Sequence, residues 1–403
     1  MKYQIKYYDE IKVGGGTIDI DNLSATEIIK KCNEINGFSK SLNWEKLVLD
    51  KKIDIAQFNS DIGSMISEPT ICTEIIDPIQ RKNCKVFYYY TEILNNITQD
   101  GDLLYYTSIH LQDNFDIVKA AVTQNGIALK YASHRLKDNT DIVKIAITQN
   151  GYALGDASNR LKDNTEIVKI AITQDGVALK YGSDRFKNNT DIVEKAVTQN
   201  GKALKYASDS LKDNKNIVKI AVTQNGDALG DASNRLKDDI DIVKIAVKAD
   251  GHALKYASHR LKDNTDIVKK AVIQNGCALE YASNRLKNNT DIVKKAVTQN
   301  GYALQYASNR LKDNTDIVKK AVTQDGRALA DASHRLKDNF DIVKIAVTSD
   351  AYALKDASDN LRDNFDIVKA AITQNAEEAS YYASERLLKD PDISKALHSA
   401  NIY

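Results

Sequence analysis

The sequence predicts an all-α protein, an α-solenoid of about 11–12 tandem helix-turn-helix repeats with a small mixed or helical N-terminal region. Three observations indicate this fold. A motif returns every 25 residues without an insertion, each copy carries two apolar stripes at helical spacing, and turn residues separate the stripes. The start of the motif, Asp-Asn-x-Asp-Ile-Val, recurs with small changes at residues 113, 138, 163, 188, 213, 238, 263, 288, 313, 338 and 363.

The first half of each repeat is predicted to form a helix of about ten residues. In the copy that starts at Asp138, residues 139–141 (Asn-Thr-Asp) suit an N-cap followed by an acidic first turn. The pair Asn150 and Gly151 is expected to end the helix, with a residue in the left-handed conformation. Between the N-cap and this C-terminal pair, apolar residues occur at i, i+1, i+4 and i+5: Ile142, Val143, Ala146 and Ile147.

The second half is predicted to form one further, similarly short helix. Arg160 and Lys162 place positive charge where the negative end of that helix is expected. Isolated helices below about 12–15 residues are marginal in water, so the repeats must be stabilised by stacking on one another. The apolar stripe of this helix is Ala153, Leu154, Ala157 and Leu161.

The period also divides the chain. The repeats are expected over residues 88–389, and degraded copies at both ends of this range are expected to act as caps. The predicted parts are an N-terminal region (1–87), a degenerate N-terminal cap repeat (88–112), ten clear repeats (113–362), a degenerate C-terminal repeat (363–389) and a C-terminal helical cap (390–403).

Composition narrows the classes of partner and compartment. Lys and Arg total 56 against 55 for Asp and Glu, which argues against a general attraction to nucleic acid or anionic membrane. The N-terminus lacks the apolar core of a signal peptide, and the apolar runs are only a few residues long. The four cysteines fit neither a disulfide framework nor a paired zinc site. We therefore expect a cytoplasmic protein that is not secreted and has no membrane partner.

The sequence contains no compact catalytic motif. No HExxH, GxSxG, GxxxxGK(S/T) or protein-kinase signature occurs, and no two histidines are spaced i, i+4. Catalysis also needs unlike residues to converge, whereas a repeat places like residues in rows. The sequence therefore predicts no enzyme, no catalytic residue, no cofactor and no metal site.

Two rows of residues are candidates for partner binding. The position after the turn glycine holds eight residue types in ten copies, and variable positions on a uniform frame are how repeat proteins encode partner choice. Neutral drift at an exposed position is the alternative explanation. This variable row is Ile127, Tyr152, Val177, Lys202, Asp227, His252, Cys277, Tyr302, Arg327 and Tyr352.

In the second candidate row, tyrosine alternates with aspartate at one repeat position. A position that accepts both residues cannot lie in dry core, and clustered tyrosines suit protein interfaces. The tyrosines are Tyr131, Tyr181, Tyr206, Tyr256, Tyr281 and Tyr306; the aspartates are Asp156, Asp231, Asp331 and Asp356. From both rows, the candidate partner-binding residues are these six tyrosines together with Tyr152, Tyr302, Tyr352, Lys202, His252 and Arg327.

Lysines and arginines also recur once per repeat. Such rows could follow a phosphate backbone, which would indicate nucleic-acid binding. Each lysine except Lys219, however, lies three residues after an acid such as Asp141, where an i, i+3 pair would simply keep the surface soluble. The solvated-face interpretation is favoured. The rows are Lys119, Lys144, Lys169, Lys219, Lys244, Lys269, Lys294, Lys319 and Lys344, and Arg135, Arg160, Arg185, Arg235, Arg260, Arg285, Arg310 and Arg335.

The repeat unit G-x-A-L-x-(Y/D)-A-S-x-x-L-K-D-(N/D)-x-(D/E)-I-V-K-x-A-(V/I) resembles an uncharacterised helical repeat domain found in giant viruses of amoebae and in some bacteria and protists. The resemblance covers about three quarters of the chain. It implies an all-α repeat fold with no established activity. It also implies a viral protein that acts in the host-cell cytoplasm.

The segment 23–52 resembles a degenerate F-box-like motif. The resemblance implies docking on a Skp1-type adaptor, although Ser24 stands where the motif usually has proline. The alternative is a small helical cap with Trp44 in its core. The residues that carry the resemblance are Leu23, Ile28, Ile29, Cys32, Asn36, Phe38, Trp44 and Leu47.

Taken together, these observations favour a non-enzymatic repeat scaffold for protein–protein interaction. An F-box-like substrate adaptor of a ubiquitin ligase is one alternative. Nucleic-acid binding along the lysine and arginine rows is the other.

Overall fold

The computed structural model describes residues 11–13, 16–18 and 93–399 of the 403-residue chain. Near the N-terminus, β1 (Ile11–Val13) pairs antiparallel with β2 (Gly16–Ile18), and Ile11 lies opposite Ile18. The predicted F-box-like segment 23–52 and its Skp1-type adaptor site lie outside the described residues. From residue 93 onward the chain is a series of helical repeats, which confirms the predicted α-solenoid.

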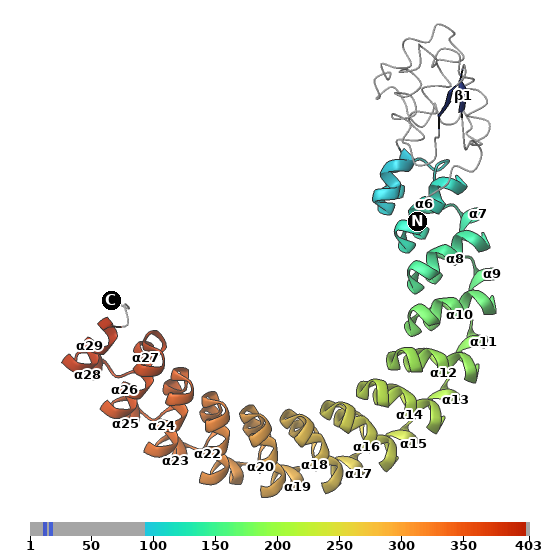
Figure 1. The fold of residues 1–403 in the computed structure, drawn as a ribbon. Coiled ribbons are helices and arrows are strands. Elements are labelled where there is room, and N and C mark those ends of the chain that lie inside the picture. Colours follow the sequence, from blue (N-terminus) through green and yellow to red (C-terminus); the bar gives the residue numbers. More distant parts are fainter. Residues whose placement is uncertain (1–10, 14–15, 19–92, 400–403) are drawn as a thin grey trace. The chain divides into compact units, whose positions relative to one another are not determined.

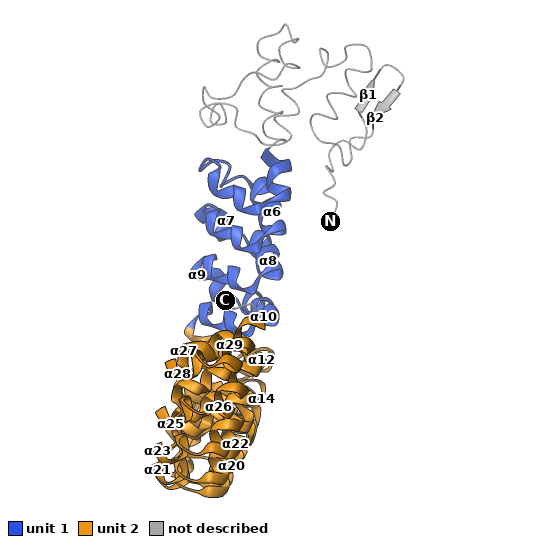
Figure 2. Ribbon diagram, turned by 90° about the vertical axis from the view of Figure 1, so that its left-hand side faces the viewer, with its two compact units in different colours: residues 1–183 blue, residues 184–403 orange. Residues whose placement is uncertain are grey.

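The chain divides into two compact units, residues 1–183 and 184–403 (Figure 2). Within unit 1, the long α-helices follow one side of the stack and the short α-helices follow the other (Figure 1). None of the helices in the described part of the chain is long and apolar enough to cross a membrane. The helices of unit 1 are residues 93–99, η3 (Gly101–Tyr106), α6 (Phe115–Gln124), η4 (Gly126–Tyr131), α7 (His134–Lys137), α8 (Thr140–Gln149), η5 (Gly151–Asp156), α9 (Asn159–Lys162), α10 (Thr165–Gln174) and η6 (Gly176–Tyr181).

Unit 2 continues the same succession of a long α-helix, a 3-10 helix (η) and a short α-helix. In its last repeat, an α-helix replaces the 3-10 helix, and one further helix follows. The helices are α11 (Asp184–Lys187), α12 (Thr190–Gln199), η7 (Gly201–Tyr206), α13 (Asp209–Lys212), α14 (Lys215–Gln224), η8 (Gly226–Asp231), α15 (Asn234–Lys237), α16 (Ile240–Ala249), η9 (Gly251–Tyr256), α17 (His259–Lys262), α18 (Thr265–Gln274), η10 (Gly276–Tyr281), α19 (Asn284–Lys287), α20 (Thr290–Gln299), η11 (Gly301–Tyr306), α21 (Asn309–Lys312), α22 (Thr315–Gln324), η12 (Gly326–Asp331), α23 (His334–Lys337), α24 (Phe340–Ser349), η13 (Ala351–Asp356), α25 (Asp359–Arg362), α26 (Phe365–Gln374), α27 (Ala376–Tyr382), α28 (Glu385–Leu388) and α29 (Pro391–Ser399).

The long helix of each repeat is the ten-residue helix that the sequence predicts. In α8, the Asn139 side chain accepts hydrogen bonds from the backbone N–H groups of Asp141 and Ile142, which caps the first turn. The Ile, Val, Ala and Ile residues of its apolar stripe are all buried. Within each unit, neighbouring long helices contact one another, and α8, for example, also contacts the 3-10 helices on either side of it, so the core of one repeat is completed by its neighbour.

The prediction of one continuous second helix is wrong, because this half of the repeat forms two short helices. A six-residue 3-10 helix, η5, is followed by the four-residue helix α9, and the backbone at Ala157 and Ser158 between them is extended. The Ser158 hydroxyl accepts a hydrogen bond from Leu161 N–H and so caps the second segment. Both segments still bury the predicted residues, since Ala153, Leu154 and Leu161 have no exposed surface.

The turn glycine serves close packing rather than a left-handed turn, so that part of the prediction is also wrong. The C-cap of the long helix α8 is Asn150, whose φ of −150° is extended, and Gly151 has no left-handed φ. A Cβ atom on Gly151 would lie 2.6 Å from the carbonyl oxygen of Ala171 in the next repeat. The same approach recurs at Gly251, where a Cβ would lie 2.5 Å from the Ala271 oxygen.

We predict that Gly251→Ala lowers the free energy of unfolding by about 1–3 kcal/mol, because the added methyl group would overlap a backbone carbonyl that cannot move without moving α18. Urea unfolding followed by circular dichroism measures the change. Ala351 occupies the equivalent position before α26, so Ala351→Gly is the matched control and should cost less than about 1 kcal/mol. An unchanged urea midpoint for Gly251→Ala would show that the close approach does not constrain this position.

A second contact between repeats joins an aspartate to a serine and an arginine. Counted by helices, a repeat runs from a long helix to the following short helix, so Asp138, the C-cap of α7, precedes the repeat of α8, η5 and α9. It accepts a hydrogen bond from the hydroxyl of Ser158 in that next repeat. Arg160 binds the same carboxylate with Nε 3.0 Å from Oδ1, and its Nη2 donates to the Asp138 carbonyl oxygen at 2.6 Å. We call this contact the joint clamp. It recurs with Arg135–Asp113, Arg235–Asp213, Arg260–Asp238, Arg285–Asp263, Arg335–Asp313 and Arg386–Asp363.

The joint clamp is not uniform along unit 2. At one joint Asn288 replaces the aspartate and still accepts from Ser308 Oγ at 2.7 Å and Arg310 Nε at 2.8 Å. At another, Asn188 meets Ser208 and Ser210, so the arginine is missing as well as the carboxylate. The second joint therefore has neutral hydrogen bonds alone, which are weaker than charge-assisted ones.

The joint clamp should make the free energy of unfolding depend on pH. The serine hydroxyl and then the arginine lower the pKa of the carboxyl groups of Asp138, Asp213, Asp238, Asp263, Asp313 and Asp363. A carboxyl whose folded-state pKa is lowered contributes stability above its unfolded pKa of about 3.9, and that contribution is lost as the pH falls through the folded pKa.

We therefore predict that the urea midpoint falls as the pH is lowered from about 5 to below about 3. The triple variant Asp238→Asn, Asp263→Asn and Asp313→Asn should be less stable than the wild type at neutral pH. Its midpoint should also fall less steeply with acid. Identical pH profiles for the two proteins would contradict a stabilising role for these carboxylates.

Candidate functional site

The variable row occupies one position of the 3-10 helices, directly after the buried glycine or alanine that begins each of them. The backbone N–H of Tyr152 donates to the Asn150 side chain at 3.0 Å, and equivalent bonds hold His252 and Tyr302. The backbone is thus fixed by the helix cap while the side chain is free to differ. Tyr302 is 52% exposed, Lys202 and Arg327 are exposed, and the other candidates in the row, Tyr152, His252 and Tyr352, are half-buried.

The row in which tyrosine alternates with aspartate occupies the last position of the same 3-10 helices. All ten of its residues are half-buried. In two of the repeats with aspartate, the preceding residue is a glycine that a tyrosine of the next repeat covers. A Cβ on Gly155 would lie 2.7 Å from the Tyr181 ring, and a Cβ on Gly230 would lie 2.8 Å from the Tyr256 ring.

Within each unit the two rows meet, because variable residues such as Tyr152 and His252 lie beside the tyrosine position of the next repeat. The Tyr152 and Tyr181 ring centroids are 6.2 Å apart, and those of His252 and Tyr281 are 6.1 Å apart, both edge to face. In the last repeat of the solenoid, Tyr382 takes the tyrosine position, 5.6 Å from Tyr352. We call this the tyrosine surface: Tyr131, Tyr152 and Tyr181 in unit 1, and Lys202, Tyr206, His252, Tyr256, Tyr281, Tyr302, Tyr306, Arg327, Tyr352 and Tyr382 in unit 2.

Some variable residues also bridge to the next repeat. His252 Nδ1 lies 2.7 Å from the Asn275 side-chain nitrogen, and Arg327 Nε donates to Asp350 at 2.6 Å. Arg327 is also 5.3 Å from the centroid of the Tyr352 ring. These side chains are therefore oriented before any partner arrives, which reduces the entropy lost on binding.

The structure adds lysines that the sequence analysis did not select. Lys180 Nζ lies 4.8 Å from the centroid of the Tyr152 ring and 4.4 Å from that of Tyr181, so one cation joins the two rows. Lys355 lies 4.0 Å from the centroid of the Tyr352 ring, and its Nζ donates to the Tyr352 hydroxyl at 2.8 Å. The hydrogen bond to Tyr352 raises the pKa of Lys355. The signal in the sequence was the dipeptide Lys-Tyr, which recurs at 130–131, 180–181, 205–206 and 255–256.

The charge of the tyrosine surface changes along unit 2. Burial, and then the negative charge of Glu280, raise the pKa of Tyr306 to about 12. The same two causes raise the pKa of Tyr281. An acidic side chain therefore accompanies the tyrosines of η10 and η11, whereas a lysine accompanies Tyr256 in η9.

The arginine row does not form a free cationic track. Seven of its members bind the aspartate of the preceding repeat or the asparagine that replaces it in the joint clamp, as Arg160 does while its side chain stays 59% exposed. The predicted i, i+3 pairs of the lysine row are also wrong. Among the described residues that row forms a single ion pair, Lys144–Glu166 at 2.8 Å, and it leads to the next repeat rather than to Asp141.

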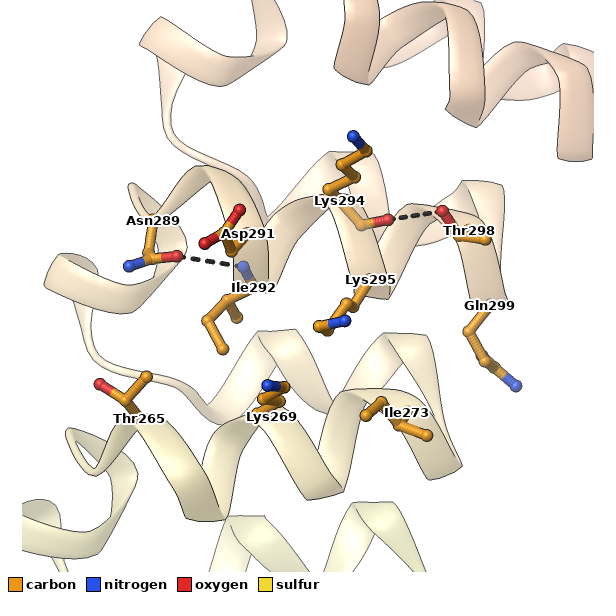
Figure 3. Close-up of a pocket in the computed structure, with 10 residues that line it drawn as sticks. All are labelled: Thr265, Lys269, Ile273, Asn289, Asp291, Ile292, Lys294, Lys295, Thr298 and Gln299. Carbon is orange, nitrogen blue, oxygen red and sulfur yellow. Dashed lines mark hydrogen bonds between the residues drawn. The ribbon is translucent and has the colours of Figure 1, made fainter.

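The long helices bear grooves between neighbouring repeats. One groove, of 720 Å³, lies between α18 and α20 and is lined mainly by polar and cationic side chains (Figure 3). Within residues 93–399, no three histidine, cysteine or acidic side chains are arranged to hold a metal ion. The lining of this groove is Thr265, Lys269, Ile273, Asn289, Asp291, Ile292, Lys294, Lys295, Thr298 and Gln299.

Comparison with known proteins identifies the repeat. A family model described as "Domain of unknown function (DUF4116)" matches eleven overlapping segments that together span residues 92–388. Each match covers two neighbouring repeats, because successive matches from residue 114 onward begin 25 residues apart and run for about two periods. No curated protein and no solved structure matches the chain. The segments are 92–137, 114–162, 139–187, 164–212, 189–237, 214–262, 239–287, 264–312, 289–337, 314–362 and 339–388.

The contact between glycine and tyrosine rings can be tested directly. We predict that Gly230→Ala displaces the Tyr256 ring, because the new Cβ would lie 2.8 Å from a ring carbon. Tyr256 should then be nitrated faster by tetranitromethane, as measured by peptide mass spectrometry, while Tyr131 in unit 1 serves as the internal reference. Equal nitration of Tyr256 in both proteins would show that the glycine does not position the ring.

Proposed function

The chain belongs to the DUF4116 family, a domain of unknown function, and we propose that it is a non-enzymatic scaffold that binds another protein through the tyrosine surface. The observation that carries the proposal is that the variable row and the tyrosine row meet on the 3-10 helices. Tyr152, Lys180 and Tyr181 show this arrangement in one place, with both rings and the cation within contact of one another.

The composition of this surface suits a protein partner. Tyrosine and arginine are enriched where protein interfaces concentrate their binding energy, since their large side chains combine apolar area with a polar group. Arg327, Tyr352, Lys355 and Tyr382 form such a group in unit 2. The half-buried rings are already held by their neighbours, so little side-chain freedom remains to be lost on binding.

Differences among repeats supply selectivity. Lys180 accompanies the tyrosines of one region, whereas Glu280 lies beside Tyr281 and Tyr306 in another. Within unit 2, a partner would therefore meet a fixed order of contacts, from Lys255 beside Tyr256 to Glu280 beside Tyr281 and Tyr306. Repeat proteins use this arrangement to recognise extended partners without catalysis.

The resemblance of the repeat unit to domains of giant viruses supports a role in the cytoplasm of an infected host cell. An F-box-like adaptor function would depend on residues 23–52, which lie outside the described residues. Binding of nucleic acid along the arginine row is disfavoured, because residues such as Arg160 and Arg260 already bind carboxylates.

The proposal predicts that the triple variant Tyr152→Ala, Tyr302→Ala and Tyr352→Ala loses its partner. Affinity capture of the tagged full-length chain, followed by quantitative mass spectrometry, should show at least about a tenfold loss of that protein, because tyrosines in interface centres often contribute more than 1 kcal/mol each.

A matched control removes three side chains from the long helices instead, with Lys144→Ala, Lys169→Ala and Lys344→Ala. Circular dichroism verifies that both variants fold. Capture should be unchanged in the lysine variant. Equal capture by the tyrosine variant and the wild type would contradict binding through the tyrosine surface.

A further inference from the structure

Positive charge is unevenly distributed along the long helices of unit 2. In five repeats the lysine row is followed by isoleucine, but in α18, α20 and α22 it is followed by a second lysine. Each of these three consecutive helices therefore has two lysines and one aspartate, a net charge of +1, whereas α24 has one of each and is neutral. The helices α14 and α16 have net charges of +2 and +1, but Lys215 of α14 forms ion pairs with Asp239 and Asp241. In these three helices, the lysines at the position of the repeat's isoleucine are Lys270, Lys295 and Lys320.

Lysines of α18, α20 and α22 line two adjoining grooves. The groove between α18 and α20 contains Lys269, Lys294 and Lys295. The next groove, between α20 and α22, has a volume of 630 Å³ and contains Lys294, Lys319 and Lys320. Lys294 and Thr298 line both grooves, so the two adjoin one another at α20. We call Lys269, Lys294, Lys295, Lys319 and Lys320 the lysine track.

The charge of the lysine track is not neutralised within the protein. In the part of the chain that the structure describes, none of its five lysines forms an ion pair. In Figure 3, Lys269 and Lys295 face the space between α18 and α20, while Lys294 extends to the other side of α20. Positive charges repel one another over a Debye length of about 8–10 Å. An anionic ligand that binds between the lysines of the track would therefore reduce their mutual repulsion.

The remaining groove residues favour a peptide over a nucleic acid. Asp291 and Asp316 lie among the lysines, where they would repel a continuous phosphate backbone but can accept hydrogen bonds from peptide N–H groups. Among the described residues, no aromatic side chain lines either groove, so bases would have nothing to stack on. Ile273, which is 55% exposed, offers an apolar contact at α18.

The distance between neighbouring long helices determines how far apart the acidic residues of a ligand should lie. Packed helices lie about 8–10 Å apart, which is the length of about three residues of extended chain at 3.3 Å each. We infer that the lysine track binds an extended peptide segment of a protein partner that carries an acidic residue at about every third position. This site lies on the long helices, whereas the tyrosine surface lies on the 3-10 helices, so its loss would leave the proposed scaffold surface intact.

The test uses the full-length chain and a fluorescein-labelled peptide that repeats Glu-Thr-Ile over about nine residues, enough to span both grooves when extended. Fluorescence anisotropy should show binding that weakens as salt is raised. The variant Lys295→Ile and Lys320→Ile installs the residue that other repeats have at this position. It should bind at least about fivefold more weakly, from two exposed ion pairs of up to about 1 kcal/mol each.

The variant Lys295→Arg and Lys320→Arg keeps the charges and should bind the peptide as the wild type does. A peptide with glutamine in place of glutamate should not bind. The inference is overturned if the wild type does not bind the Glu-Thr-Ile peptide, or if the isoleucine variant or the glutamine peptide binds equally well. Tighter binding of an oligothymidylate of the same net charge would also overturn it, in favour of a nucleic-acid site.

Discussion

The position of every side chain on the solenoid depends on how one repeat is joined to the next. At the joint of Asp138, a single carboxylate accepts hydrogen bonds from Ser158 and Arg160 of the following repeat. At the turn between α8 and η5, Gly151 has no side chain, so its backbone approaches the Ala171 carbonyl oxygen of the next repeat. The first contact adds directional, charge-assisted bonds, and the second sets how closely the backbones approach. Together with the shared apolar core they give each repeat one position on its neighbour.

A fixed joint allows the exposed positions to vary without changing the fold. The residue after the turn glycine is held through its backbone N–H, so tyrosine, histidine, cysteine and arginine can all occupy it. The long helices show the same freedom, since lysine replaces the isoleucine of other repeats at Lys295 and Lys320. Two surfaces of different chemistry can therefore share one frame, one aromatic and the other cationic.

The sequence was sufficient for the architecture because a 25-residue period repeats the same stripes many times, and each long helix carries its own cap and apolar face. It was insufficient where a residue's role depends on a partner in another repeat. Arg160 was interpreted as a surface cation because its partner Asp138 lies 22 residues away, beyond any helical spacing. The break before Ser158 was missed because capping by a serine hydroxyl competes locally with helix continuation. The two candidate rows were predicted from the sequence. The contact of Lys180 with both Tyr152 and Tyr181 was not, because it depends on the distance between neighbouring repeats, which the sequence pattern does not give.

The central claim, that the joint clamp fixes each repeat on its neighbour, is tested most directly by native-state hydrogen exchange along unit 2. The joint at Asn188 has Ser208 and Ser210 but neither the carboxylate nor the arginine, whereas Asp238 and Asp263 hold Arg260 and Arg285. Asn188 holds the repeat that begins with α12, whereas Asp238 and Asp263 hold the repeats that begin with α16 and α18. The account predicts that the amides of α12 exchange faster than those of α16 and α18, because the joint before α12 opens more readily. Equal protection of α12 and of α16 and α18 would contradict it.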